Sequence, residues 1–442
     1  MHHSPVIDEF DIIYDAVSPF WSLSGQEVRD IMAEVESSMD SELWLCTFSG
    51  AQATTRCSHP HRTFDRHIED SFNSLLRDMG GRLPDLKLLV NHFDEPRVLI
   101  PPPKFRSMDF GSERFQLTDM SRQPVWDAVT KFCAYQERKK ALNSSMMRQP
   151  TLPFAADPLW AMDLCQHPEY SAMHGLAISP TSFRMFEGPV PILSTGTLST
   201  MGDILYPSPA YNESEFKYMD SHDVPWEKKW NNLYWAGSTT GGYAVNERWS
   251  DYHRQRFVQV AQNLERRQYS YIRERDGVLG LVKSSFLNSR LYNVAFTRVF
   301  QCDRKRCNDQ QSYFNIKPWA DNNEALRSRL VFDTDGNGIS GRYHKLLASK
   351  SAPLKQTLLH EWHDDRLKPW VHYIPVSQSM EELPELVLYF TSTESGQRWA
   401  QEIAEQGREW FAKSFRDVDM TIFMYRLLLE LARLQDPRRL AS

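Results

Sequence analysis

The stretch that decides the fold is Leu233-Tyr-Trp-Ala-Gly-Ser-Thr-Thr-Gly-Gly242, a short apolar run that passes directly into a turn of small residues. Such a pattern is typical of a buried strand that ends in a tight turn. The turn exposes backbone N–H groups and hydroxyls, the groups that bind phosphate oxygens. It is neither GxGxxG nor a Walker A motif, so the pattern alone describes a simple connection equally well.

Further elements are predicted on both sides of this turn. His253-Arg-Gln-Arg256 opens a helical pattern whose arginines either reach an anion held by the turn or form a solvated face. Apolar runs at Leu86–Val90, Arg329–Phe332 and Val371–Ile374 predict strands. This alternation of helices and strands indicates an α/β protein.

Other signals predict helices near both ends of the chain and irregular structure in its middle. Ser24-Gly-Gln-Glu27 is a capping box that opens a helix, and residues 64–79 have helical spacing and stop at two glycines. The Pro-, Ser- and Gly-rich stretch 149–209 predicts irregular surface segments that join two domains. Near the end, an apolar stripe predicts a packing helix through Met420, Phe423, Met424, Leu427, Leu428 and Leu431.

Composition excludes several classes of protein. The chain has 442 residues, 41% of them hydrophobic, which favours two globular domains. A formal net charge of −6 gives no indication of a nucleic-acid partner. No run reaches the ~18 apolar residues of a membrane span, and the N-terminus has no signal-peptide pattern, so we expect a targeting segment, if there is one, to lie outside this chain.

The run Asp333-Thr-Asp-Gly-Asn-Gly-Ile-Ser-Gly-Arg342 allows three interpretations. It matches the start of an EF-hand loop, but His344 stands where a bidentate Glu is needed. Alternatively, Asp333 and Asp335 form a metal-binding Asp-x-Asp. The third interpretation is a tight turn that presents Ser340, Gly341 and Arg342 at a helix N-terminus, where a diphosphate would bind.

Two other patterns carry less information. His360-Glu-Trp-His363 lacks the HExxH spacing and a third ligand, so zinc is disfavoured. The cysteines show no CxxC pair and leave the redox compartment open; they are Cys46, Cys57, Cys133, Cys165, Cys302 and Cys307.

Four ordered motifs together resemble glycosyltransferase family 90, which includes fungal capsule-associated xylosyltransferases and Rumi-like protein O-glucosyltransferases. They are WAGSTTGGY (235–243), DTDGNGISGR (333–342), HEWH (360–363) and KPWVHYIPV (368–376). Upstream, His174-Gly175, Ser179–Ser182 and Asp203–Pro209 are similar to the fungal branch. The resemblance covers roughly residues 40 to 437.

The resemblance implies a fold. It is α/β of the GT-B type, with two Rossmann-like domains facing across a cleft and a C-terminal helix that crosses back to the first. We therefore expect an acceptor-side domain over residues 1–222, a nucleotide-sugar-binding domain over 223–415, and the returning helix over 416–442.

The resemblance also implies an inverting transfer, which needs a base on the acceptor hydroxyl. Asn91-His-Phe-Asp-Glu-Pro96 matches the Asn-x-x-Asp-x-Pro context of that base, so Asp94 is the predicted base and Glu95 its nearest rival. The alternative is an Asp that only shapes a turn. The predicted UDP-sugar-binding residues are Gly237, Ser238, Thr239, Thr240, Gly241, Arg254, Ser340, Gly341, Arg342 and Glu361.

One position departs from the Rumi-like branch, which has an Arg in the turn after Gly-Ser where this chain has Thr239. Arg254 is the predicted replacement. Fixed donors would then stabilise the UDP leaving group without an essential metal or other cofactor.

The expected donor is UDP-xylose, with UDP-glucose next, and the expected acceptor is a glycan or glycoprotein. By resemblance the protein works in the Golgi or endoplasmic reticulum lumen. A lumenal protein would be able to hold a Cys302–Cys307 disulfide and glycans on Asn143 and Asn212. The competing hypothesis is a non-catalytic carbohydrate-binding protein on a degenerate transferase fold.

Overall fold

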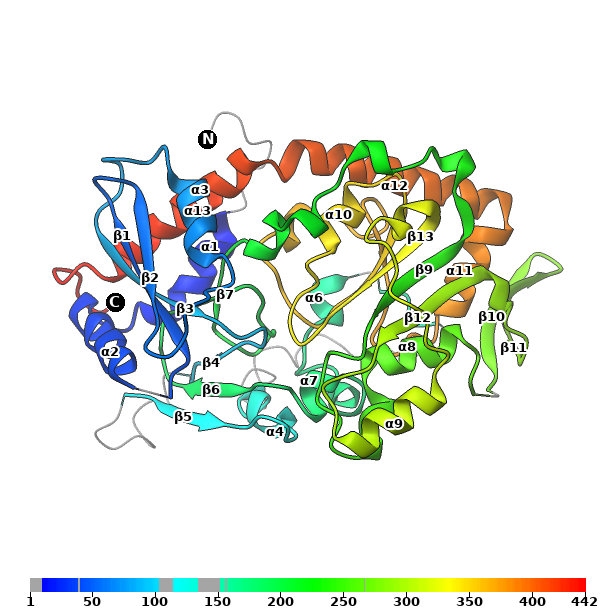
Figure 1. Ribbon diagram of the computed structural model, residues 1–442, viewed down its shortest axis with the longest axis horizontal. Helices are drawn as coiled ribbons and strands as arrows, with labels where there is room; N and C mark the ends of the chain where they lie inside the picture. Colours follow the sequence, from blue (N-terminus) through cyan, green and yellow to red (C-terminus); the bar gives the residue numbers. More distant parts are fainter. Residues whose placement is uncertain (1–9, 39, 103–113, 134–151, 156, 266) are drawn as a thin grey trace.

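The computed structural model describes residues 10–38, 40–102, 114–133, 152–155, 157–265 and 267–442 (Figure 1). Its larger half is built on a parallel sheet with the strand order β12-β9-β13-β14-β15. The strands are β9 (Trp230–Ser238), β12 (Tyr292–Arg298), β13 (Ser328–Thr334), β14 (Ala352–Gln356) and β15 (Ile374–Pro375). Because a parallel sheet is covered on both faces, its central strand β13 is apolar and buried at successive positions, as the sequence predicted.

Helices of the same half pack on this sheet. α8 (His253–Ala261) contacts β12, α11 (Leu383–Ser392) contacts β9, and α12 (Glu394–Ser414) contacts β14. α9 (Arg304–Tyr313) and α10 (Tyr343–Leu347) follow β12 and β13 along the chain, and the hairpin of β10 (Tyr269–Arg275) and β11 (Val278–Ser284) projects at the far end (Figure 1). The predicted strand 371–374 is shorter than expected, since only Ile374 and Pro375 pair with β14.

The other half contains a mixed sheet with the order β2-β1-β3-β7-β8. β1 (Leu43–Ser49), β2 (Thr54–Ser58) and β3 (Leu86–Asn91) pair antiparallel, and β7 (Ile192–Ser194) and β8 (Ile204–Leu205) add parallel to β3. A smaller sheet of β4 (Val98–Leu99), β6 (Arg184–Glu187) and β5 (Gln116–Asp119) lies below it (Figure 1).

The N-terminal helices begin at recognisable signals. α1 (Phe10–Val17) precedes α2 (Gly25–Ser37), which starts at the predicted capping box: Ser24 accepts from the Glu27 N–H, and Glu27 accepts from the Ser24 N–H. α3 (Ile68–Leu76) is shorter than the predicted helix over 64–79, because Arg66 and His67 adopt positive φ angles of 56° and 64° just before it.

The prediction for residues 149–209 was wrong in one respect. Within the described part of this stretch lie α6 (Pro158–Ala161), α7 (Gly175–Ile178) and three strands. Some of its apolar side chains, with Val129 of α4 (Trp126–Val129), belong to a separate core cluster, and those of β7 and β8 belong to the core of the mixed sheet. The three strands have two to four residues, too few to show an alternating pattern of apolar and polar residues. They are defined by pairing with strands elsewhere in the sequence.

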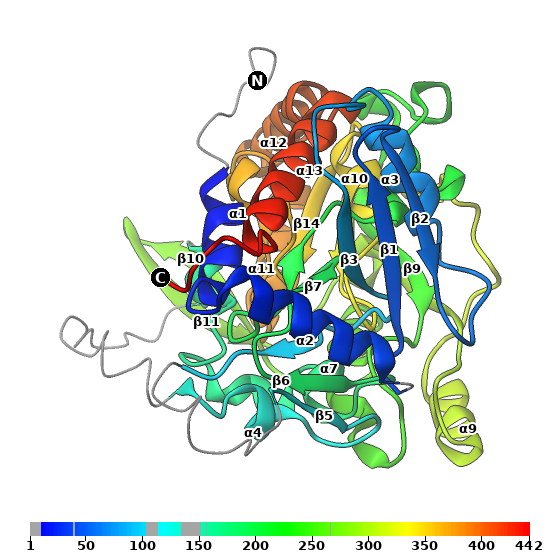
Figure 2. The ribbon, with the colours of Figure 1, turned by 90° about the vertical axis from the view of Figure 1, so that its left-hand side faces the viewer.

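The last helix, α13 (Asp417–Leu434), carries the predicted stripe. All six stripe residues are buried in one cluster with apolar side chains of α1, α2, α3 and β3. Figure 2 shows α13 beside α1, with α12 behind. None of the helices in the described part of the chain is long and apolar enough to cross a membrane. The chain is therefore a mixed α/β protein, and the three-part domain division stays a prediction.

Candidate active site

Asp94 lies in the loop that follows β3, and hydrogen bonds of the Asn91 side chain hold this loop in place. The Asn91 side chain spans this loop: its amide nitrogen donates to the Glu95 carbonyl at 2.8 Å, and its amide oxygen accepts from the Phe93 N–H at 2.9 Å. Asp94 lines a cavity of about 360 Å³. The Asn-x-x-Asp spacing therefore has a structural cause, because the asparagine fixes the turn that presents the aspartate.

Its neighbour Glu95 points the opposite way. Glu95 is 2% exposed and its carboxylate accepts from the Ser182 N–H at 3.0 Å. Burial, with a contribution from the nearby Asp94, raises the pKa of Glu95 to about 8. The side chain of Asp94 is 38% exposed. Of the two predicted candidates, only Asp94 faces the cavity.

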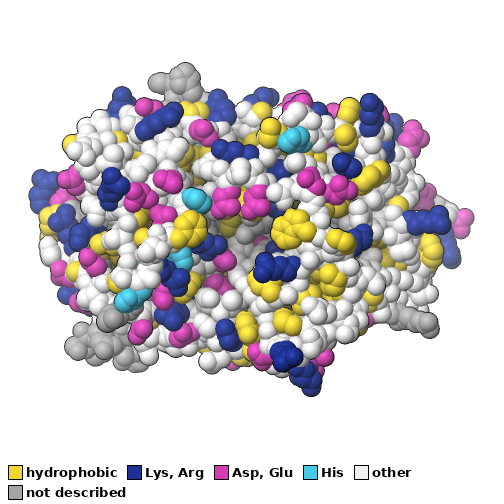
Figure 3. All heavy atoms as spheres, in the orientation of Figure 1, with side chains coloured by type: hydrophobic (Ala, Val, Ile, Leu, Met, Phe, Trp, Pro, Cys, Tyr) yellow, Lys and Arg dark blue, Asp and Glu magenta, His cyan; other side chains and the backbone are white. Residues whose placement is uncertain are grey.

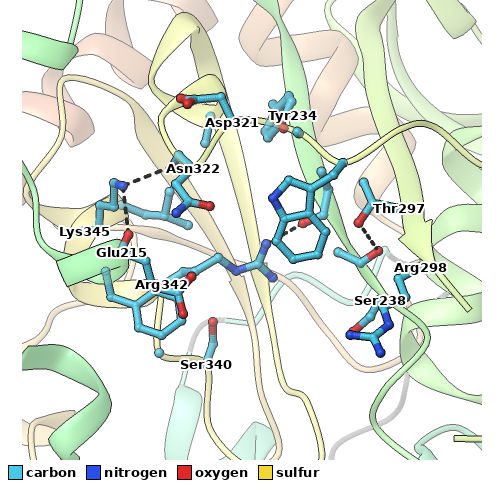
Figure 4. Close-up of a pocket in the computed structure, with 18 of the residues that line it drawn as sticks. Glu215, Tyr234, Ser238, Thr297, Arg298, Asp321, Asn322, Ser340, Arg342 and Lys345 are labelled. Carbon is cyan, nitrogen blue, oxygen red and sulfur yellow. Dashed lines mark hydrogen bonds between the residues drawn. The ribbon is translucent and has the colours of Figure 1, made fainter. Parts of the chain in front are cut away.

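A second cavity, of about 380 Å³, opens at the carboxyl ends of β9 and β13. Figure 4 shows Arg342 extending into it, between Ser340 and Tyr234. The predicted binding residues that line it are Gly237, Ser238, Arg254, Ser340, Gly341 and Arg342. Ligands of open α/β sheets bind at this edge, so the location agrees with the sequence analysis.

Two guanidinium groups give this cavity its charge: that of Arg254, which is buried, and that of Arg342, which is half-buried. Arg342 donates to the Ala236 carbonyl at 2.6 Å, and Arg254 donates to the Asp335 carbonyl at 2.6 Å and to the Thr240 hydroxyl at 2.5 Å. Burial lowers the pKa of both, that of Arg254 to about 9 with a contribution from Arg342. Within the described residues neither makes an ion pair with a carboxylate, which favours binding of an anion.

The other predicted binding residues of the turn after β9, Thr239, Thr240 and Gly241, do not line the second cavity. Thr239 is 1% exposed and its hydroxyl donates to the Phe300 carbonyl at 2.8 Å. The Gly241 N–H donates to the Asn337 side chain at 3.0 Å, and its φ of 105° suits glycine. Thr240 lines the Asp94 cavity. Thr239 and Gly241 thus shape the turn and do not line either cavity.

The two aspartates of the Asp-x-Asp face the interior. Asp333 is 1% exposed and accepts from the Ser340 hydroxyl at 2.5 Å. Asp335 is 2% exposed and accepts from the Thr357 hydroxyl and the Leu358 N–H, each at 2.7 Å. Their carboxylates hold the loop from β13 to α10, which is the tight turn of the third interpretation.

Glu361 lies outside both cavities. It is 1% exposed, and its carboxylate accepts from Lys355 at 2.9 Å and from the Tyr211 hydroxyl. Burial raises the pKa of Glu361 to about 7. The structure thus places Glu361 in a buried polar network and does not bring it to the predicted nucleotide site.

The two cavities adjoin. Both are lined by Glu215, Phe216, Ile339 and Gly341, so the Asp94 cavity and the Arg342 cavity share a wall. In Figure 3 acidic side chains gather around a hollow at the centre of the face. A group held at the shared wall would have the Asp94 cavity on one side and the guanidinium donors on the other.

Sequence reasoning missed several lining residues. The second cavity, which contains Arg254 and Arg342 and is called the cationic cavity below, is also lined by Arg298, Asn322 and Lys345. The 72% exposed Trp319 lines it too. Arg66 pairs with Asp94 at 2.7 Å. None of them belongs to a recognisable motif; the only available signal was that Arg298 ends a strand, where parallel-sheet ligands bind.

The six cysteines, all in the described part of the chain, form three pairs: Cys46–Cys57, Cys133–Cys165 and Cys302–Cys307. The last is the pair that the sequence suggested. Asn143 lies outside the described residues. Asn212 lines a broad groove beside the Asp94 cavity, so a glycan there would stand close to the candidate site.

Comparison with known proteins agrees with the resemblance. Residues 234–439 match the sequence model of glycosyl transferase family 90. This match confirms the family resemblance for the half of the chain that contains the cationic cavity.

The curated relatives match over stretches of different length. The O-glucosyltransferase rumi of Drosophila pseudoobscura pseudoobscura is 37% identical over 79 residues, which are 17% of this chain and 19% of that protein. Human protein O-glucosyltransferase 1 is 34% identical over 108 residues, 24% of this chain and 26% of that protein. The rumi homolog of Anopheles gambiae is 26% identical over 257 residues, 55% of this chain and 56% of that protein. The matched stretches thus span little more than half of these relatives at most.

Proposed function

Because residues 234–439 form a glycosyltransferase family 90 domain, we propose that the protein is an inverting glycosyltransferase that moves a sugar from a UDP-sugar to a hydroxyl of a glycan or glycoprotein. One observation carries this proposal: a carboxylate and two guanidinium groups line two adjoining cavities that share a wall. The arrangement supports a GT-B-like division, with the acceptor on the Asp94 side and the nucleotide on the sheet side.

In this mechanism Asp94 acts on the acceptor. Its carboxylate takes the hydroxyl proton while the acceptor oxygen attacks the anomeric carbon. The new glycosidic bond forms on the face opposite the leaving group, so the anomeric configuration inverts. The sugar would occupy the wall shared by both cavities, where Glu215 and Phe216 face it.

The departing UDP takes the electron pair of the broken bond. Arg342, Arg254 and the backbone of the turn at Gly237 and Ser238 would stabilise this growing negative charge. Their hydrogen bonds to protein carbonyls hold the guanidinium groups in place before the substrate arrives. We propose that these fixed donors make a divalent metal unnecessary.

Two donors are proposed. The fungal-type motifs favour UDP-xylose, whereas the names of the curated relatives, which are O-glucosyltransferases, support UDP-glucose. Working in the secretory pathway is supported by the three disulfides, which persist in oxidising compartments.

The test is UDP release from a panel of UDP-sugars in the presence of EDTA, with wild type, Asp94→Asn and Arg342→Ala. We expect one donor to be turned over by the wild type, with EDTA having no effect and both variants inactive. Activity lost on adding EDTA would contradict the metal-free mechanism. UDP binding without turnover of any donor, even with glycan and glycoprotein acceptors added, would favour the carbohydrate-binding alternative.

A further inference from the structure

The loop before α3 places a cation on the proposed base, which the mechanism above does not use. The Arg66 guanidinium lies 2.7 Å from Asp94 Oδ1 and donates to the His92 carbonyl at 3.0 Å. The Arg66 side chain is 47% exposed and lines the same cavity as Asp94. A cation in contact with a carboxylate holds it in one orientation.

The backbone of this loop adopts an uncommon conformation that presents Arg66. Arg66 and His67 are consecutive non-glycine residues with φ angles of 56° and 64°. Left-handed conformations of this kind persist only where surrounding contacts enforce them, and they gather at functional sites. Here Asp65 supplies the contacts, because its carboxylate accepts from the His67 N–H at 3.0 Å and from the Glu69 N–H at 2.7 Å.

The groups around Asp94 make Arg66 its principal partner. In the described part of the chain Arg66 is the one cation that forms an ion pair with Asp94. Burial lowers the pKa of His92 to about 4 and raises that of Glu95 to about 8, so both are neutral near pH 7. The other titratable groups that line the cavity are Tyr206, Glu213 and Glu215.

The Arg66 guanidinium contacts the Asp94 carboxylate through one of its two oxygens, Oδ1. A carboxylate has two oxygens, so a contact through Oδ1 is compatible with proton acceptance at Oδ2.

We propose that Arg66 is a positioning residue for sugar transfer, which orients the Asp94 carboxylate toward the acceptor hydroxyl. The inference rests on the proposed function. In the step, the proton moves from the hydroxyl to Asp94, the acceptor oxygen bonds to the anomeric carbon, and UDP leaves with the electron pair of the old bond.

The test compares Arg66→Gln, Arg66→Lys and a matched control, Arg62→Gln, in UDP release from the preferred UDP-sugar. Arg62 lies four residues away and pairs with Glu42 at 2.7 Å. For Arg66→Gln we expect kcat to fall about 10- to 100-fold with the KM values for donor and acceptor within about twofold. Arg66→Lys should restore most of kcat, and Arg62→Gln should match the wild type.

Three results would overturn the inference in a folded Arg66→Gln variant whose Tm matches the wild type. They are an unchanged kcat, a loss of kcat that lysine does not restore, and an effect on the acceptor KM alone, which would make Arg66 an acceptor-binding residue. A wild type that releases no UDP from any donor would overturn the proposed function, and with it this inference. An active wild type with an equally active Arg66→Gln variant would overturn the inference only.

Discussion

The backbone of Gly338 lies directly against the backbone of Asp94. A Cβ atom at position 338 would stand 2.2 Å from the Asp94 carbonyl oxygen and 2.9 Å from the Asp94 Cβ. The loop after β13 therefore touches the loop after β3, and this contact sets the distance between the proposed base and the cationic cavity. Only glycine allows the two loops to approach so closely.

Replacing Gly338 with alanine should therefore separate the loops. Because the clash is with backbone, no side chain can move to relieve it, and we expect kcat/KM for UDP release to fall at least about tenfold, since small displacements of reacting groups are costly. Gly280→Ala is the control, because a Cβ there meets nothing within 4 Å. Full activity in Gly338→Ala would show that the contact is not required.

Replacing each of the two arginines of the cationic cavity should have different effects on UDP binding and on stability. Arg342 donates to the carbonyl of Ala236, whereas Arg254 joins the glycine turn to the carbonyls of Thr334 and Asp335. We expect Arg342→Ala to weaken UDP binding about 10- to 100-fold at nearly unchanged Tm, as loss of a charged hydrogen-bond donor does. Arg254→Ala should weaken binding and also lower Tm by several degrees, about 2–4 °C for each kcal/mol lost.

Calorimetric titration with UDP and thermal unfolding separate the two effects. Arg273→Gln, on the exposed hairpin strand β10, is the charge-matched control. Equal binding of UDP by Arg342→Ala and wild type would contradict the assignment of the cavity.

Stability should depend on pH through Glu95. Its pKa in the folded protein is about 8, above the ordinary 4.5, because burial disfavours the charged form. Between these values the unfolded chain ionises and the folded protein does not, so the folded state loses about 1.4 kcal/mol per pH unit as the pH rises. Glu95→Gln should remove this part of the pH dependence, visible as a smaller difference between urea midpoints at pH 5 and pH 8. An unchanged slope would mean that Glu95 is ionised in the folded protein.

The disulfides should contribute unequally to stability. Cys133–Cys165 closes a sequence separation of 32, and Cys302–Cys307 one of only 5. In the chain-entropy model the longer loop stabilises by roughly 1.5 kcal/mol more. We therefore expect the paired serine variant of Cys133 and Cys165 to unfold at a lower urea concentration than that of Cys302 and Cys307. The reverse order would indicate that native contacts, not loop length, dominate.

Much of the framework of the candidate site was predictable from local pattern. The strand before Asn91, the strand before the glycine turn and the tight turn that presents Arg342 each have an apolar run followed by turn residues. Such signals are local, and the family resemblance supplied the roles proposed for the residues that follow. The elements that carry Asp94 and Arg342 are confirmed, and the roles of the two residues stay predictions.

The rest depends on contacts between distant segments. Arg66 approaches Asp94 because two residues of its loop, Arg66 and His67, adopt left-handed backbone conformations. No pattern in the sequence predicts these conformations. Glu361 lies in a recognisable motif, yet Lys355 and Tyr211 hold it in the interior. The short strands β7 and β8 have no period of their own, and pairing with β3 and with each other defines them.

The position of α13 bears on how the protein is made. The helix follows α1, α2 and β3 in the sequence and is therefore made after them, yet its stripe is buried among their side chains. Until α13 emerges, the apolar surface that it buries on these elements stays uncovered. The first half of the protein therefore finishes folding only after synthesis of the second half, and during that interval it is a natural client for chaperones.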